Sequence, residues 1–124
     1  MEYDIKLFMQ LRTLERRIEH IKKKLQKLGP MRPGSLSKQY NVCGMPKCRC
    51  KNPTNPQKHG PYYQLSYVHQ GKSTTRFIRK PLRRSIEQQV VNYKLFKRLM
   101  EEWIHLSIEY SDQQLELAKR QSPL

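Results

Sequence analysis

Residues 43–50 of the chain read CGMPKCRC, and residues 59–63, a short way downstream, read HGPYY. Zinc in proteins takes four tetrahedral ligands, chiefly thiolates and imidazoles, and short loops can deliver these ligands with few residues between them. Cys43, Cys48 and Cys50 supply three thiolates within eight residues. Three cysteines cannot all pair as disulfides inside one chain, so this stretch favours a metal site in a reducing compartment.

The fourth ligand is predicted to be a histidine. His59 follows Cys50 by nine residues and is the only histidine in the turn-rich segment before the predicted strands. His69 is the reserve ligand. His20 and His105 fall in predicted helices and are interpreted as ordinary surface or seam residues. The sequence therefore predicts one zinc ion held by three thiolates and one imidazole.

The surroundings of these ligands bear on what the zinc does. A catalytic zinc keeps one position open for water and usually lies near a carboxylate that acts as a general base. Residues 32–80 contain no Asp or Glu, so a closed site is predicted to be structural and to contribute folding energy to a loop with little core. Two alternatives stay open: reduced thiols without a metal, and a redox role favoured by neighbouring Lys47, Arg49 and Lys51.

Two β-prone runs follow the predicted ligands. Residues 62–69 and 73–80 are rich in Tyr, Val, Thr, Phe and Ile, and a Gln-Gly-Lys turn separates them, which predicts a β-hairpin. One face of the first strand would carry Tyr63, Leu65 and Tyr67, and the other would carry Tyr62, Gln64 and Ser66. In the second strand Phe77 would share a face with Thr75 and Arg79, and Ile78 with Arg76 and Lys80. The pattern does not decide which face is buried.

Long helical patterns flank this region. From Leu7 onward, apolar residues are spaced alternately by four and three, as in a coiled-coil seam, and Gly29 and Pro30 end the helix. A second, wider stripe follows Pro81. The first seam contains Leu7, Leu11, Leu14, Ile18, Ile21, Leu25 and Leu28, and the second contains Phe96, Leu99, Trp103, Leu106, Tyr110 and Leu117, widened by Ile86, Val90, Tyr93 and Met100.

These patterns predict an α+β fold in one compact domain. Residues 1–31 form the N-terminal helix, residues 32–80 the zinc loop and β-hairpin, and residues 81–124 the C-terminal long helix. Because the inserted module brings the chain back, the helices are expected to pack as an antiparallel, coiled-coil-like pair. The width of the second stripe predicts a further neighbour, either a symmetry mate in a homodimer or the zinc module.

The positive charge is concentrated in the middle of the chain. The formal net charge is +15, and residues 32–80 carry ten Lys and Arg and no acid. Such a segment attracts polyanions, and solubility alone gives no reason to exclude acids from one segment. No run of apolar residues approaches the roughly 20 that span a bilayer, so no membrane partner is expected. The N-terminal MEYDIKLFMQ does not look like a leader, and a cytoplasmic location is expected.

Three motifs carry a resemblance to known sequences: Gly34-Ser-Leu, Cys43-Gly-x-Pro-x-Cys-x-Cys and His59-Gly-Pro-Tyr-Tyr-x-Leu. With them the chain resembles a family of small, uncharacterised prokaryotic proteins that are often encoded near transposase genes. The resemblance covers about residues 34–103. It agrees with a zinc site and implies an association with mobile elements, but it brings no established activity.

The leading hypothesis for function is a zinc-containing module that binds nucleic acid, DNA or RNA. Lys and Arg would contact phosphates, while Tyr62, Tyr63 and Tyr67, which interleave with them, would stack on bases of a single strand. Alternatively, the two-stranded ribbon would enter a major groove and its arginines would read guanines. The predicted nucleic-acid-binding residues are Lys38, Lys47, Arg49, Lys51, Lys58, Tyr62, Lys72, Arg76, Arg79 and Lys80.

A second hypothesis is a protein-interaction adaptor. In it the helices dimerise or grip a partner such as a transposase, and the zinc head is the docking surface. An enzyme is not expected, because the sequence has no glycine-rich phosphate loop, no carboxylate cluster in the basic segment and no nucleophile with a base at suitable spacing.

Overall fold

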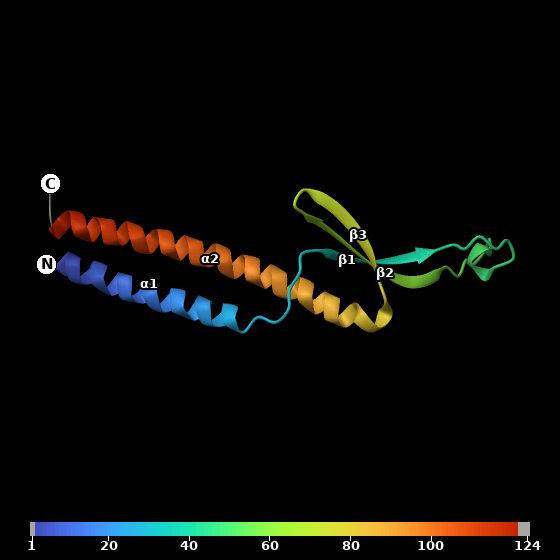
Figure 1. Ribbon diagram of the computed structural model, residues 1–124, viewed down its shortest axis with the longest axis horizontal. Coiled ribbons are helices and arrows are strands. Elements are labelled where there is room, and N and C mark those ends of the chain that lie inside the picture. The colour runs from blue at the N-terminus through green and yellow to red at the C-terminus, as the bar shows by residue number, and fades with distance from the viewer. Residues whose placement is uncertain (1, 122–124) are drawn as a thin grey trace. The chain divides into compact units, whose positions relative to one another are not determined.

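The computed structural model of the chain describes residues 2–121 and confirms the α+β class. Along the chain, one long helix precedes and another follows a three-stranded antiparallel sheet (Figure 1). The cysteine cluster lies close to that sheet. The elements are α1 (Glu2–Gln26), β1 (Ser35–Asn41), β2 (His59–His69), β3 (Lys72–Ile78) and α2 (Arg83–Gln121), with short 3-10 turns at Arg49–Lys51 and Lys80–Leu82.

The chain forms two compact units. One unit contains α1 and the part of α2 that begins at Lys94, and the other is Pro30–Tyr93. The first turns of α2 therefore belong to the unit that contains the sheet. Among the described residues, no helix has the length and apolar character needed to cross a membrane.

In the helical unit, α1 buries the seam that its sequence predicts. Its side chains Leu7, Leu11, Leu14 and Ile21 are buried. Acidic residues in the first turn and lysines in the last turn complement the helix dipole. After Gln26, backbone hydrogen bonds from Lys27 N–H to the Lys24 carbonyl and from Leu28 N–H to the Leu25 carbonyl tighten the end of the helix, just before Gly29 and Pro30.

The two helices of this unit run in opposite directions, side by side (Figure 1). Leu7 and Leu11, near the start of α1, cluster with Leu117 near the end of α2. The main cluster is Leu14, Ile21, Leu99 and Leu106, so later residues of α1 meet earlier residues of α2. This order confirms the expected antiparallel contact between the helices.

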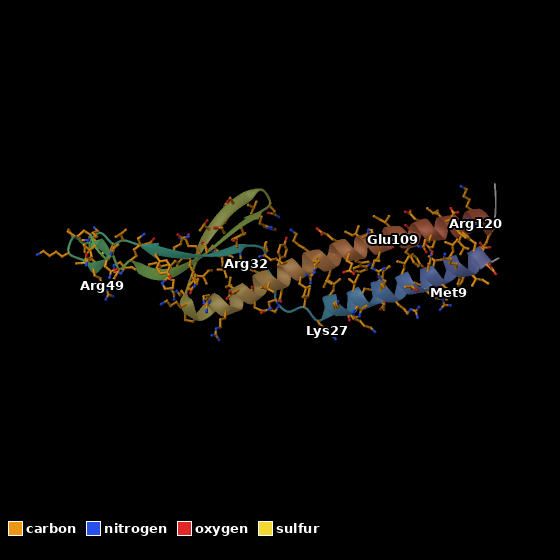
Figure 2. All side chains as sticks on the ribbon, turned by 180° about the vertical axis from the view of Figure 1, so that it is seen from behind. Met9, Lys27, Arg32, Arg49, Glu109 and Arg120 are labelled. Atoms are coloured by element: carbon orange, nitrogen blue, oxygen red, sulfur yellow. The ribbon has the colours of Figure 1, made fainter. Side chains whose placement is uncertain are left out.

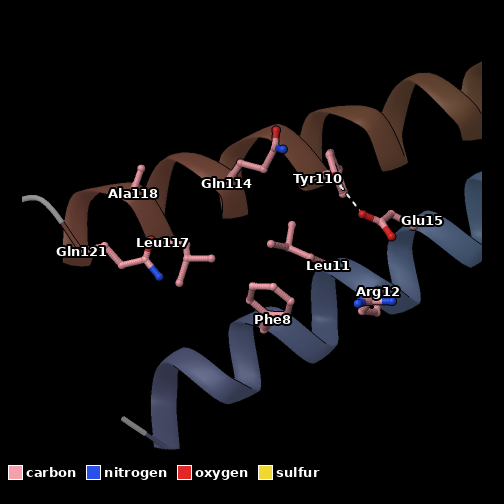
Figure 3. Close-up of a pocket in the computed structure, with 9 residues that line it drawn as sticks. All are labelled: Phe8, Leu11, Arg12, Glu15, Tyr110, Gln114, Leu117, Ala118 and Gln121. Carbon is pink, nitrogen blue, oxygen red and sulfur yellow. Dashed lines mark hydrogen bonds between the residues drawn. The ribbon is translucent and has the colours of Figure 1, made fainter.

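A polar contact joins the helices between these clusters. The Tyr110 hydroxyl donates a hydrogen bond of 2.9 Å to Glu15 Oε1, and the two side chains face each other in Figure 3. This bond raises the pKa of Tyr110, because the carboxylate stabilises the protonated phenol.

The sheet has the order β1-β2-β3, with both neighbouring pairs antiparallel. The predicted hairpin is present, with Gln70 and Gly71 at its turn, both at positive φ. No strand was predicted at β1. This edge strand, SLSKQYN, has few apolar residues and no alternating apolar pattern, so its pairing with β2 could not be seen in its own sequence.

The register of the sheet decides which face is buried. Leu65 on β2 is fully buried and lies opposite Leu36 on β1 and Arg76 on β3. Gly34 closes this face: its φ is +147°, and a Cβ at that position would come within 2.5 Å of Leu65 Cδ1. Only glycine adopts this conformation and allows this approach without strain.

Arginines lie over the two tyrosines that share a face with Leu65. The guanidinium of Arg32 lies 4.5 Å from the centre of the Tyr67 ring, and that of Arg83, in the first turn of α2, lies 5.2 Å from the centre of the Tyr63 ring. Arg32 also donates its backbone N–H to the Gln89 carbonyl at 3.1 Å. The Leu65 face is therefore the inner face of the sheet, in contact with residues before β1 and at the start of α2.

Candidate metal centre and basic surface

The pairing of β1 with β2 brings the predicted metal ligands together. Asn41, the last residue of β1, lies opposite His59, the first residue of β2. Cys43 follows Asn41 by two residues, so the histidine and the first cysteine meet at the same end of the strand pair. The loop between them, residues 42–58, extends from this end and carries Cys48 and Cys50 (Figure 1).

Backbone hydrogen bonds shape the loop around the cysteines. Cys48 N–H donates to the Met45 carbonyl at 3.2 Å, which closes the turn after Cys43, and Lys51 N–H donates to the Cys48 carbonyl at 3.0 Å. The Arg49 carbonyl accepts from both Asn52 N–H and Gln57 N–H, at 3.2 and 3.1 Å. These bonds fold the loop back toward β2 without any contribution from an apolar core.

The four predicted ligands form a compact group. Their ligating atoms all lie within 4.8 Å of one another, with Cys43 Sγ 3.6 Å from Cys50 Sγ and Cys48 Sγ 3.2 Å from His59 Nε2. With Zn–S bonds of about 2.3 Å, tetrahedral geometry separates two thiolates by about 3.8 Å. Cys50 is buried and the other three are half-buried. The group could therefore hold a metal ion.

The thiols of this group differ in acidity. The backbone N–H of Cys50, followed by hydrogen bonds with the neighbouring thiols, lowers the pKa of Cys48 to about 6. Burial raises the pKa of Cys50. A thiol with a lowered pKa is largely thiolate at neutral pH, which is the form that binds metals.

Gly60 fixes the approach of His59 to the loop. Its φ is +139°, and a Cβ at this position would come within 2.7 Å of the Gln39 carbonyl oxygen on β1. A side chain would push the strands apart at the point where β2 presents its histidine. Close packing against β1 therefore explains why glycine occupies position 60, and the sequence alone does not show this contact.

The reserve ligand His69 lies elsewhere. It is the last residue of β2, next to the hairpin turn, and is exposed. A strand that rises about 3.3 Å per residue separates it from His59 by about 33 Å. His20 lies on α1, and His105 pairs with Glu109 on α2 at 3.2 Å.

We predict that His59→Ala weakens metal binding by at least tenfold, because it removes one of four ligands, whereas His69→Ala leaves metal affinity unchanged. Competition with a chromophoric zinc chelator measures both affinities. A larger loss in the His69 variant would reassign the fourth ligand.

The basic residues singled out in the sequence are all exposed. Those of the metal-site loop include Arg49, beyond the ends of β1 and β2 (Figure 2). Tyr62 is half-buried. Around the metal ligands the structure places Lys47, Arg49, Lys51 and Lys58; on the strands it places Lys38, Lys72 and Arg76; directly after β3 it places Arg79 and Lys80.

Sequence reasoning missed Phe77 as a surface residue. Its side chain is 61% exposed, and its ring centre lies 6.0 Å from that of Tyr62. A phenylalanine in a β-prone run is most often taken as core. The signal that could have found it is its alternation with Ile78, which becomes informative only once the buried face of the sheet is known.

The comparisons with known proteins give a family without a described activity. No curated protein and no solved structure matches the chain. A family model described as "domain of unknown function (DUF6788)" matches residues 11–88, which span most of α1, the whole sheet with its metal-site loop, and the first turns of α2. The chain belongs to the DUF6788 family.

Proposed function

We propose that this protein is a non-enzymatic, zinc-stabilised module that binds nucleic acid. The observation that carries the proposal is the position of the Cys3His group inside a segment that has ten Lys and Arg and no acid. The nine cations predicted as contacts are all exposed. A folded, acid-free segment of this kind suits a polyanion.

Zinc is the metal that best suits the ligand set. Three thiolates and one imidazole at near-tetrahedral spacing are typical of structural zinc sites, whereas magnesium and calcium take oxygen ligands. Cys43, Cys48, Cys50 and His59 would fill all four positions, and residues 32–80 offer no carboxylate as a general base. Bound there, zinc would act as a structural cross-link that holds the loop against β1 and β2.

Phosphate contacts would supply most of the affinity. Each Lys or Arg that meets a phosphate releases a counterion, so affinity falls with salt in proportion to the number of contacts. The mobile-element association implied by the sequence motifs fits such a role, since proteins of this kind act on or near nucleic acid. A cytoplasmic location is part of the same proposal.

The test is a retardation assay with random-sequence DNA and RNA over a range of salt. If about six cations meet phosphates, the slope of log affinity against log salt is expected near −5 on duplex DNA and near −4 on a single strand. Replacing Arg76 and Arg79 together by Gln should flatten the slope by about two units.

The matched control replaces Arg16 and Arg17 by Gln. These two exposed residues lie on α1, so the net charge changes equally outside the basic segment. An equal flattening in the control pair would show that total charge, rather than the basic segment, determines binding. Complete lack of retardation at low salt would overturn the proposed function.

A second candidate function is supported by an apolar groove on α2. Met100, Trp103 and Ile104 line it together with Ser107, Ile108 and Ser111, and Ile104 and Ile108 are each 55% exposed. This groove favours the adaptor hypothesis, in which the helices form a homodimer or hold a protein partner such as a transposase. The adaptor takes first place if no nucleic acid is bound.

A further inference from the structure

The face of the sheet opposite Leu65 carries a pair of aromatic side chains, Tyr62 and Phe77. Side chains directly opposite each other in a sheet share a face, so Gln64 and Phe77 lie together, as do Ser66 and Thr75. Alternation along β2 adds Tyr62 to this face. The Tyr62 and Phe77 rings lie 6.0 Å apart with a tilt of 46°. We call this surface the outer face.

The aromatic side chains on the two faces of the sheet differ in how far they are covered. On the inner face Leu65 is fully buried, and arginines lie over Tyr63 and Tyr67. On the outer face Phe77 is 61% exposed. Exposed apolar side chains are common on this chain, but Phe77 is paired with a second aromatic ring, and such a pair is a candidate contact surface.

The neighbours of this ring point to the chemistry of its ligand. Alternation after β3 places Arg79, an exposed cation, on the same side as Phe77. Ser66 and Thr75 contribute hydroxyls 3.3 Å apart, and Gln39 donates to Ser37 at 3.2 Å on β1. The other neighbours of the ring on this face are therefore mostly neutral and polar, with Val68 nearer the hairpin turn. Residues 32–80 contain no acid, so the strands that form this face contribute no charge that would repel an anion.

We propose that the outer face, with Phe77 and Tyr62 at its centre, is a stacking surface for the bases of single-stranded nucleic acid. The inference rests on the proposed function and names its substrate class. Aromatic rings on an open sheet stack on unpaired bases of any sequence, while surrounding cations hold the backbone. In a duplex the base faces are hidden, so Phe77 would gain nothing from it.

Fluorescence anisotropy with labelled 20-nucleotide random-sequence probes tests the inference on the full, zinc-loaded chain. The probes are single-stranded DNA, single-stranded RNA and duplex DNA. The wild type is expected to bind both single strands more tightly than the duplex. Phe77→Leu, which keeps apolar volume and removes the ring, should weaken single-strand binding about tenfold and leave duplex binding unchanged.

Two further variants make the result specific to stacking. Phe77→Trp retains a stacking ring and should bind single strands as tightly as the wild type. Single strands should quench the fluorescence of the new tryptophan. This quenching is the excess over the change in Trp103 fluorescence that the wild type shows with the same probes. Val91→Ala, which trims an exposed aliphatic side chain on α2 rather than on the outer face of the sheet, should change neither affinity.

The possible failures are distinguishable. Wild-type single-strand affinity in Phe77→Leu, or a preference of the wild type for duplex, overturns the stacking surface while the proposed function stands. Absence of binding to all three probes overturns the proposed function and the stacking surface together. Unequal affinities for the DNA and RNA single strands show which of them the outer face prefers, provided that Phe77→Leu weakens both.

Discussion

Cys48→Ser is expected to abolish stoichiometric zinc binding and to unfold the loop of residues 42–58, while α1 and α2 stay helical. The loop is held by a few backbone hydrogen bonds and by the ligand group, and Cys50 is its only buried side chain. Structural zinc sites contribute roughly 10–16 kcal/mol of apparent binding free energy in small zinc peptides, far more than such a loop could replace by packing.

Elemental analysis and amide hydrogen exchange measure the two parts of this prediction. The loop should exchange freely in the variant, whereas the helices, whose core lies in Leu14, Ile21, Leu99 and Leu106, should keep their protection. Ser73→Ala, at an exposed position of the hairpin, is the control and should keep its metal. A protected, metal-free loop in Cys48→Ser would show that zinc is not what holds it.

Leu106→Ala is expected to destabilise the helical unit by about 2–5 kcal/mol. Leu106 is fully buried in the main cluster between the helices, so truncation leaves a cavity that its neighbours cannot fill. Urea unfolding followed by far-UV circular dichroism measures the change. Leu115→Ala on the same helix is the matched control: its side chain is 69% exposed, and its effect should stay within about 0.5 kcal/mol.

Equal stabilities of the two leucine variants would place the core of the unit elsewhere. Trp103 is only half-buried, so Trp103→Ala should cost less than a fully buried tryptophan would.

The helices and the ligand group were predictable because their signals are local. The seam of α1 repeats over several turns, and each repeat adds evidence for the same face, so Leu7, Leu11, Leu14 and Ile21 were identified as core. The grouping of Cys43, Cys48, Cys50 and His59 was predictable because chemistry restricts it: few residue types bind zinc, and short spacings bring them together.

Strand β1 and the choice of the buried face of the sheet could not be predicted, because both depend on contacts between residues far apart in the sequence. β1 is a strand because β2 offers it a partner, and its own residues Ser35–Asn41 carry no pattern of burial. The choice between the faces of β2 depends on Gly34, Arg32 and Arg83, which reach Leu65, Tyr67 and Tyr63 only in the folded chain. Non-local contacts of this kind leave no periodicity in the sequence.

In the function proposed for this protein, a metal held by the Cys3His group organises a surface that binds nucleic acid. The most direct test of this function follows the anisotropy of a labelled random-sequence single strand at fixed low salt, as zinc-loaded protein is treated with a chelator and then resupplied with zinc. We expect tight binding, a loss of at least tenfold when the metal is removed, and full recovery when zinc returns. Unchanged affinity of the metal-free protein, or no binding by the zinc-loaded protein, would contradict the proposed function.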